Sequence, residues 1–128
     1  MADPKCSGNT QQSTRLIFAC SGAADVGELA DRAARELSRL GAGRMFCLPG
    51  VGAKLQSFVG TTQGADQILA LDGCGVDCAR HILESSEIDG FTHVRVTDLG
   101  LEKGRTPVDE GSARRVVDHA LGLLAEQR

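Results

Sequence analysis

The sequence is poor in aromatic residues, in basic charge and in long apolar runs. It has no Trp or Tyr and only four Phe among 128 residues, and 14 Lys and Arg stand against 17 Asp and Glu, for a formal net charge of −3. Proteins that bind single-stranded nucleic acid stack bases on aromatic rings, and phosphate backbones require a basic patch. No apolar stretch approaches the ~20 residues that span a bilayer. The composition therefore predicts neither a nucleic-acid partner nor a membrane partner.

Secretion signals and the common nucleotide-binding motifs are also missing. Residues 1–14 are small and polar and lack the apolar stretch of a secretory signal, so we expect a cytoplasmic protein. Neither GxGxxG nor GxxxxGK[ST] occurs, which argues against the nucleotide sites that these motifs build. In a reducing compartment, the five cysteines of this chain are better suited to metal binding or redox chemistry than to disulfides.

What the chain does contain is an alternation of strand and helix patterns. Short apolar runs predict four strands, at residues 15–20, 44–48, 66–71 and 93–96. Helical spacing of apolar residues predicts helices over residues 25–40, after Pro49, over residues 75–86 and from Thr106 onward. Thr106 suits the cap of the last helix, Pro107 its first position and Asp109 its first turn.

This alternation predicts the class of fold. Strands that alternate with helices form parallel sheets covered on both faces, joined by right-handed crossovers. We expect a small doubly wound α/β fold, Rossmann-like or flavodoxin-like, built as a three-layer α/β/α sandwich with about four parallel strands. Residues 1–14 are expected to be a flexible N-terminal tail, and residues 15–128 a single α/β metal-binding domain.

Four of the five cysteines lie where predicted strands end. Cys20 ends the first strand, Cys47 lies near the end of the second, Cys74 follows the third, and Cys78 lies one turn into the next helix. The carboxyl ends of parallel strands share one edge of the sheet, where ligand sites form, and residues i and i+4 share a helix face. Four thiolates on that edge would supply the tetrahedral set that structural zinc prefers. The alternative is four buried, inert thiols.

Four other residues are candidates to lie beside such a site. Asp72 and Asp98 follow strands, where each would orient a ligand or accept a hydrogen bond from an amide, although turn chemistry explains them as well. His81 lies three residues after Cys78 and is a candidate ligand or neighbour of the metal. Ser21 belongs to a polar loop that, with residues 99–105, is expected to flank a small-molecule pocket.

These motifs together resemble those of a known family. They are Cys20-Ser21-Gly22, Cys47-Leu48-Pro49-Gly50-Val51-Gly52, Asp72-Gly73-Cys74 with Cys78-Ala79, and Thr97-Asp98-Leu99-Gly100. They are similar to motifs of the DGC-domain family, which is named after its Asp-Gly-Cys motif and is regarded as zinc-binding. The resemblance covers roughly residues 15–107. It implies that zinc is chelated by four cysteines, matching Cys20, Cys47, Cys74 and Cys78, and it implies no established activity. Cys6 lies outside the matching region. Two roles stay open for it, a free thiol or an exchangeable fifth ligand.

Three other interpretations of the cysteines stay open. Cys74 and Arg80 satisfy C-x5-R, the layout of cysteine phosphatases and arsenate reductases, in which the loop amides hold an oxyanion while the thiolate attacks. Against this, Asp77 would place a negative charge inside that anion-binding loop. Cys74 and Cys78 would otherwise form a redox pair, although C-x-x-C is the usual spacing. Four thiolates also hold iron–sulfur clusters. The sequence leaves enzymatic activity undecided, with a metal ion as the expected partner and a small molecule or a protein as further ones.

Overall fold

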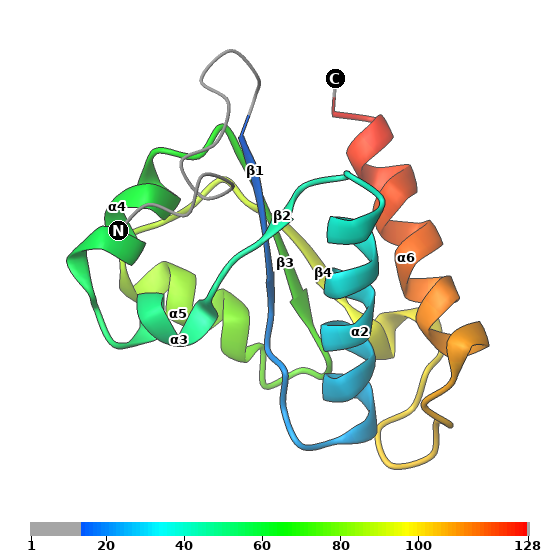
Figure 1. The fold of residues 1–128 in the computed structure, drawn as a ribbon. Helices are drawn as coiled ribbons and strands as arrows, with labels where there is room; N and C mark the ends of the chain where they lie inside the picture. Colours follow the sequence, from blue (N-terminus) through cyan, green and yellow to red (C-terminus); the bar gives the residue numbers. More distant parts are fainter. Residues whose placement is uncertain (1–13, 128) are drawn as a thin grey trace.

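The computed structural model describes residues 14–127, which form one parallel sheet with helices on both faces (Figure 1). The strands are Arg15–Ala19 (β1), Arg44–Met45 (β2), Gln67–Asp72 (β3) and Thr92–Arg95 (β4). The helices are Asp25–Arg39 (α2), Leu48–Gly52 (α3), Gln56–Gln63 (α4), Cys78–Ser85 (α5) and Glu110–Ala125 (α6), with a 3-10 helix at Val96–Leu99 (η1).

The order of the strands in the sheet is β2-β1-β3-β4, and all three pairings are parallel. The chain moves from β1 outward to β2 and then returns past β1 to β3. The direction of winding therefore reverses between β1 and β3. In sheets of this kind, ligands bind outside the carboxyl ends of the strands at such a reversal. The predicted doubly wound α/β fold is confirmed.

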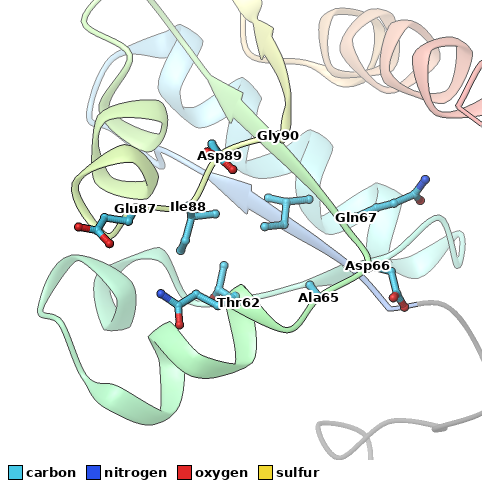
Figure 2. A pocket seen from close by; sticks show the side chains of 10 residues that line it. Thr62, Ala65, Asp66, Gln67, Glu87, Ile88, Asp89 and Gly90 are labelled. Atoms are coloured by element: carbon cyan, nitrogen blue, oxygen red, sulfur yellow. The ribbon is translucent and has the colours of Figure 1, made fainter.

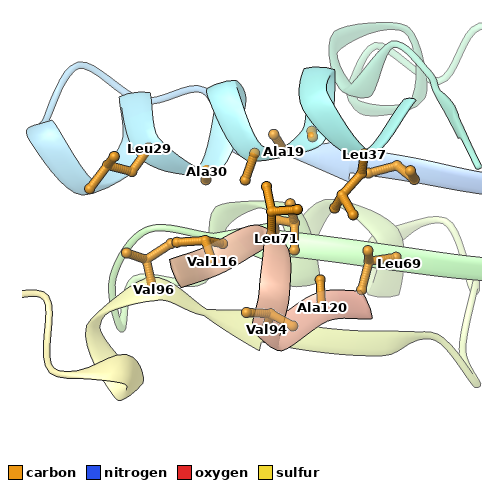
Figure 3. Close-up of a cluster of buried hydrophobic side chains, with 14 of the residues drawn as sticks. Ala19, Leu29, Ala30, Leu37, Leu69, Leu71, Val94, Val96, Val116 and Ala120 are labelled. Atoms are coloured by element: carbon orange, nitrogen blue, oxygen red, sulfur yellow. The ribbon is translucent and has the colours of Figure 1, made fainter. Parts of the chain in front are cut away.

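One core lies between the sheet and helices α2 and α6 (Figure 3). Alternate residues of a strand point to opposite faces, so Leu69 and Leu71 of β3 face this core together. Helix α2 supplies Leu29 and Leu37 from its apolar face, and all four of these side chains are fully buried. The pattern of apolar residues at helical spacing in the sequence accounts for this layer.

A second core lies on the other face, under α3, α4 and α5 (Figure 1). Phe18 of β1 and Ala70 of β3 are fully buried there against Val51 of α3 and Leu83 of α5. Both faces of the central strands are therefore covered, which explains why these strands read as continuous apolar runs rather than alternating ones.

The structure corrects several predicted boundaries. Strand β2 is only two residues long, and Cys47 is the residue that precedes α3 rather than part of a strand. The single helix expected after Pro49 is two helices, and the predicted loop at residues 60–65 is largely helical. The break falls at Lys54, whose φ is 62°, and whose ammonium group donates to the Ser85 carbonyl at the end of α5.

The first turns of the last two helices also differ from prediction. Helix α5 begins at Cys78 rather than at residue 75. Helix α6 begins at Glu110, and its cap is Asp109, whose carboxylate accepts a hydrogen bond from the Ser112 amide at 2.9 Å. Thr106 lies in the loop before this helix, where its amide donates to Asp25 and its hydroxyl donates to the Glu102 carbonyl.

Shortening Leu71 to alanine should destabilise the protein strongly. Its side chain is fully buried near the carboxyl end of β3, so Leu71→Ala would leave a cavity and reduce the free energy of unfolding by about 3 kcal/mol. The matched control is Leu55→Ala, at a side chain that is 50% exposed, where a change within about 0.5 kcal/mol is expected. Urea unfolding followed by circular dichroism measures both, and equal losses would contradict this assignment of the core.

Candidate functional site

The structure places the four predicted cysteines at the carboxyl edge of the sheet. Cys20 directly follows β1, Cys74 lies two residues after β3, Cys47 precedes α3, and Cys78 is the first residue of α5. Cys20 and Cys74 are half-buried, Cys47 and Cys78 are exposed, and all four are free thiols. Helices α3 and α5 pack against each other, which sets the two exposed cysteines at the starts of neighbouring helices (Figure 1).

Backbone amides surround the sulfur of Cys20. The Cys20 amide continues the β1–β3 ladder to the Leu71 carbonyl at 3.0 Å, and the Gly73 amide donates to Cys20 Sγ at 3.3 Å. Burial raises the pKa of the Cys20 thiol, the amides of Gly22 and Gly73 lower it, and the charges of Asp72 and Cys78 raise it. Burial is the largest of these effects, so the pKa of Cys20 is raised although two amides donate to its sulfur.

The Asp-Gly-Cys motif has a steric basis at its glycine. A Cβ atom on Gly73 would lie 2.7 Å from the Gly27 amide nitrogen and 2.8 Å from the Val26 carbonyl carbon, both in the first turn of α2. Gly27 in turn lies against Gly22: a Cβ on Gly27 would come within 2.8 Å of the Gly22 backbone. Backbone cannot yield as a flexible side chain does, so only glycine fits this contact between the loops after β1 and β3.

Cys74 faces the loop between η1 and α6. The Lys103 ammonium group donates to Cys74 Sγ at 3.5 Å. Asp25 ties this loop to the start of α2, because its carboxylate accepts from the amides of Gly104 at 2.8 Å and Thr106 at 3.0 Å. These two amide hydrogen bonds hold the pKa of Asp25 below its usual range.

A cluster of charged groups lies beneath the loop of residues 73–77. Within residues 14–127, the set of three side chains that could ligate a metal with atoms within 4.8 Å of one another is Asp72, Asp77 and His93. His93 Nε2 lies 2.8 Å from Asp72 Oδ2 and 3.6 Å from Asp77 Oδ1. Arg95 donates to both Asp77 oxygens, at 2.9 and 2.5 Å. This paired hydrogen bonding between Arg95 and Asp77 lowers the pKa of Asp77 and raises the pKa of Arg95.

Sequence reasoning assigned no role to His93, Asp77 or Arg95 in this cluster. Asp72, in contrast, was a candidate, and it is 1% exposed and accepts hydrogen bonds from the amides of Ala79 and Arg80. The available signal was the alternation of His93 and Arg95, because residues i and i+2 of a strand share one face of the sheet. Arg95 is also the register partner of Asp72 across the β3–β4 pair.

The other candidates lie further from the sulfurs. Ser21 has a φ of 54° and its hydroxyl donates to Asp31 at 2.8 Å. The Asp98 side chain is 64% exposed and accepts from Arg95 at 3.4 Å. The His81 side chain is 70% exposed and lies 4.0 Å from Glu84. Within the described residues, no hydrogen bond or ion pair joins these three side chains to a cysteine, and their roles stay predictions.

A cavity of about 280 Å³ lies at the opposite edge of the sheet (Figure 2). Asp66 and Gln67 line it at the start of β3, and Gly90 lines it just before β4. Because these residues stand at the amino ends of parallel strands, this cavity is separate from the cysteine-bearing edge. It lends no support to the small-molecule pocket predicted beside Ser21.

The fold and this edge define a small doubly wound α/β protein with free thiols at the carboxyl ends of its strands. The DGC domain model matches residues 16–120, and the chain belongs to the DGC domain family. The match spans all four strands and reaches into α6.

The chain is also similar to a named bacterial protein. This relative is the "Anaerobic and virulence modulator AnvM" of Pseudomonas aeruginosa strain PAO1, 35% identical over 88 residues that cover 69% of this chain and 67% of the relative. No solved structure matches the chain. Every helix within residues 14–127 is too short or too polar to cross a bilayer.

Replacing Gly73 by alanine should disturb the loop at the site. The added Cβ would meet α2 backbone, and we expect Gly73→Ala to lower the free energy of unfolding by about 2 kcal/mol. Gly75→Ala, two residues along the same loop, is the control, because a Cβ there meets nothing within 4 Å. Thermal unfolding of the two variants should separate them, and equal behaviour would show that the close contact is not a constraint.

The Asp77–Arg95 pair should make stability depend on pH. Since the pKa of Asp77 is lower in the folded state than the ~3.9 of a free aspartate, its contribution is present above about pH 4 and is lost as the pH falls through the folded value. In metal-free protein, Asp77→Asn should therefore lower the melting temperature at pH 7, and its difference from wild type should shrink as the pH falls below about 4. A difference that stays constant between pH 7 and pH 3 would contradict this pairing.

Proposed function

We propose that this protein binds a zinc ion through Cys20, Cys47, Cys74 and Cys78. A shell of four thiolates leaves zinc no open position, so the ion would cross-link the loops after the strands rather than act as a Lewis acid. Membership of the DGC domain family, the shared edge of the sheet and the absence of any disulfide among these four residues support this assignment.

The observation that carries the proposal is the environment of Cys20. Burial raises the pKa of the Cys20 thiol overall, and the amides of Gly73 and Gly22 act against that effect. Metals bind the thiolate, so zinc would displace the proton of Cys20, and these two amides would then stabilise the negative sulfur. A small apolar residue at this position would leave these two amides without an acceptor.

Zinc binding would require the sulfurs to move closer together. Thiolates around one tetrahedral zinc, with Zn–S near 2.3 Å, lie about 3.8 Å apart. Among residues 14–127, no three cysteine sulfurs lie within 4.8 Å of one another. Cys47 and Cys78 are exposed, so a rotation about χ1 of either side chain meets little steric resistance. The half-buried Cys20 and Cys74 would then be the fixed half of the site and the exposed pair the adjustable half.

The regulatory role in this proposal is supported by the name of the similar bacterial protein and not by the geometry of the cysteine-bearing edge. The similar protein of Pseudomonas aeruginosa is named a modulator, and a closed zinc shell suits a protein that acts by contact better than one that turns over a substrate. We therefore propose a cytoplasmic, zinc-stabilised modulator whose partner is another protein.

A thiol enzyme of the C-x5-R type is the weaker candidate. Arg80 would have to turn into the loop that begins at Cys74, yet its guanidinium pairs with Glu84 at 3.3 Å on the surface of α5. Asp77 adds a buried carboxylate at the end of the same loop. Two carboxylates around this arginine oppose the binding of an oxyanion there.

Elemental analysis of protein purified under reducing conditions tests the proposal. We expect about one zinc per chain, with thiols that react only after chelation, because four thiolates suffice for one tetrahedral ion. Cys74→Ser should lose most of the bound zinc, whereas Cys6→Ser should keep nearly all of it. Cys6 lies outside the described residues.

Each possible result points to one interpretation. Bound iron with visible absorption would replace zinc by an iron–sulfur cluster. Full zinc content in Cys74→Ser would refute the four-cysteine site, and a large loss in Cys6→Ser would make Cys6 a ligand in place of one of the four. Five thiols that react from the start, without metal, would favour the thiol enzymes.

A further inference from the structure

The loop of residues 73–77 joins two of the proposed zinc ligands and has little apolar packing of its own. Cys74 lies near its start, and Cys78 follows its end. Between them, a Cβ on Gly75 would meet nothing within 4 Å, and Val76 is 59% exposed. Gly73 lies against α2 and Cys74 packs against the core under that helix, but burial of apolar side chains does not hold residues 75–77, so their conformation depends on polar contacts.

Asp72 fixes the start of α5 from outside the helix. Its Oδ1 accepts from the Ala79 amide at 2.7 Å and its Oδ2 from the Arg80 amide at 3.1 Å. Asp77, the residue that precedes α5, makes no side-chain cap. The carboxylate at the end of β3 therefore does the work of a helix cap, and it ties the first turn that carries Cys78 to the central strand of the sheet.

His93 and Arg95 fix the other side of the loop. His93 Nε2 lies between the two carboxylates, and because a carboxylate only accepts, this nitrogen donates to Asp72. Asp77 adopts a φ of 55°, a strained value for a residue other than glycine. The paired hydrogen bonds from Arg95 to both Asp77 oxygens hold it there.

The same groups are poorly arranged to hold a cation of their own. Both Asp72 oxygens already accept amide hydrogen bonds, and the Arg95 guanidinium occupies both Asp77 oxygens. A metal ion placed among these side chains would lie beside a permanent positive charge. The cluster is therefore better suited to hold neighbouring backbone segments in place than to bind a metal ion.

We propose that Asp72, Asp77, His93 and Arg95 are positioning residues for the cysteine site: they set the path of the loop between Cys74 and Cys78. This inference rests on the proposed zinc site. Asp72 anchors the first turn of α5, His93 links Asp72 to Asp77, and Arg95 holds the strained residue immediately before Cys78. Groups that orient metal ligands in this indirect way commonly change metal affinity by about 10- to 100-fold.

Titration of metal-free protein with Co²⁺ tests this role, because the thiolate-to-cobalt and d–d absorption bands report the number of sulfurs and the geometry around the metal. His93→Leu should lower Co²⁺ affinity by about 10- to 100-fold and alter the d–d bands. His93→Gln, which retains a side-chain N–H donor, should restore both. His119→Leu is the matched control, since His119 is exposed on α6 and should leave affinity and spectrum unchanged.

A second variant guards against simple loss of folding. Asp77→Gly removes the carboxylate that Arg95 holds but tolerates the positive φ, so the chain should stay folded by circular dichroism. Weaker Co²⁺ binding with altered d–d bands is expected here as well. A wild-type chain without thiolate–cobalt bands would overturn the proposed function and this inference with it. A wild-type chain that shows those bands, while His93→Leu and Asp77→Gly titrate identically to it, would overturn the inference alone.

Discussion

The contact between Gly73 and the first turn of α2 is the constraint on which the rest of the edge depends. With no Cβ at Gly73, the loop after β3 lies directly on the backbone of Val26 and Gly27. The Gly73 amide lies 3.3 Å from Cys20 Sγ, and Gly27, which also lacks a Cβ, lies against the backbone of Gly22 in the loop after β1. Through these two glycine contacts, the loops after β1 and β3 both lie against the start of α2. The half-buried Cys20 and Cys74 belong to these two loops and are thereby placed near each other.

Charge organises the region that these glycines bring together. Asp25 holds the loop that carries Lys103, Asp72 holds the first turn of α5, and Arg95 holds Asp77. In each case the carboxylate or guanidinium makes at least two hydrogen bonds, so each loop is fixed in direction as well as in distance. The cysteine-bearing edge is therefore ordered by polar contacts, while the two aliphatic cores behind it carry most of the burial.

Much of this architecture can be predicted from the sequence, since it depends on periodicity. Apolar spacing located β1, β3, β4 and α2 to within a few residues, and the strand-end placement of Cys20 and Cys74 followed from parallel topology alone. The failures occurred where a distant residue overrides a local signal. Thr106 has the residue type of a helix cap, but Asp25 holds its amide in the loop before α6, and the first turn of α5 donates to Asp72 rather than to a neighbouring cap residue. The alternation of His93 with Arg95 indicated only a shared face of a strand, because the partner of His93 is a carboxylate 21 positions away in the sequence.

The outer strands of the sheet are short and interrupted. Strand β2 has two residues, and β4 has four before the chain tightens into η1. Unpaired backbone groups at a sheet edge invite another chain to add a strand, and proteins suppress this by shortening edges and placing charges on them. Strand β4 also carries His93 and Arg95. Within residues 14–127, the sheet thus offers little template for edge-to-edge aggregation, and association with another protein would more readily use its helices and loops.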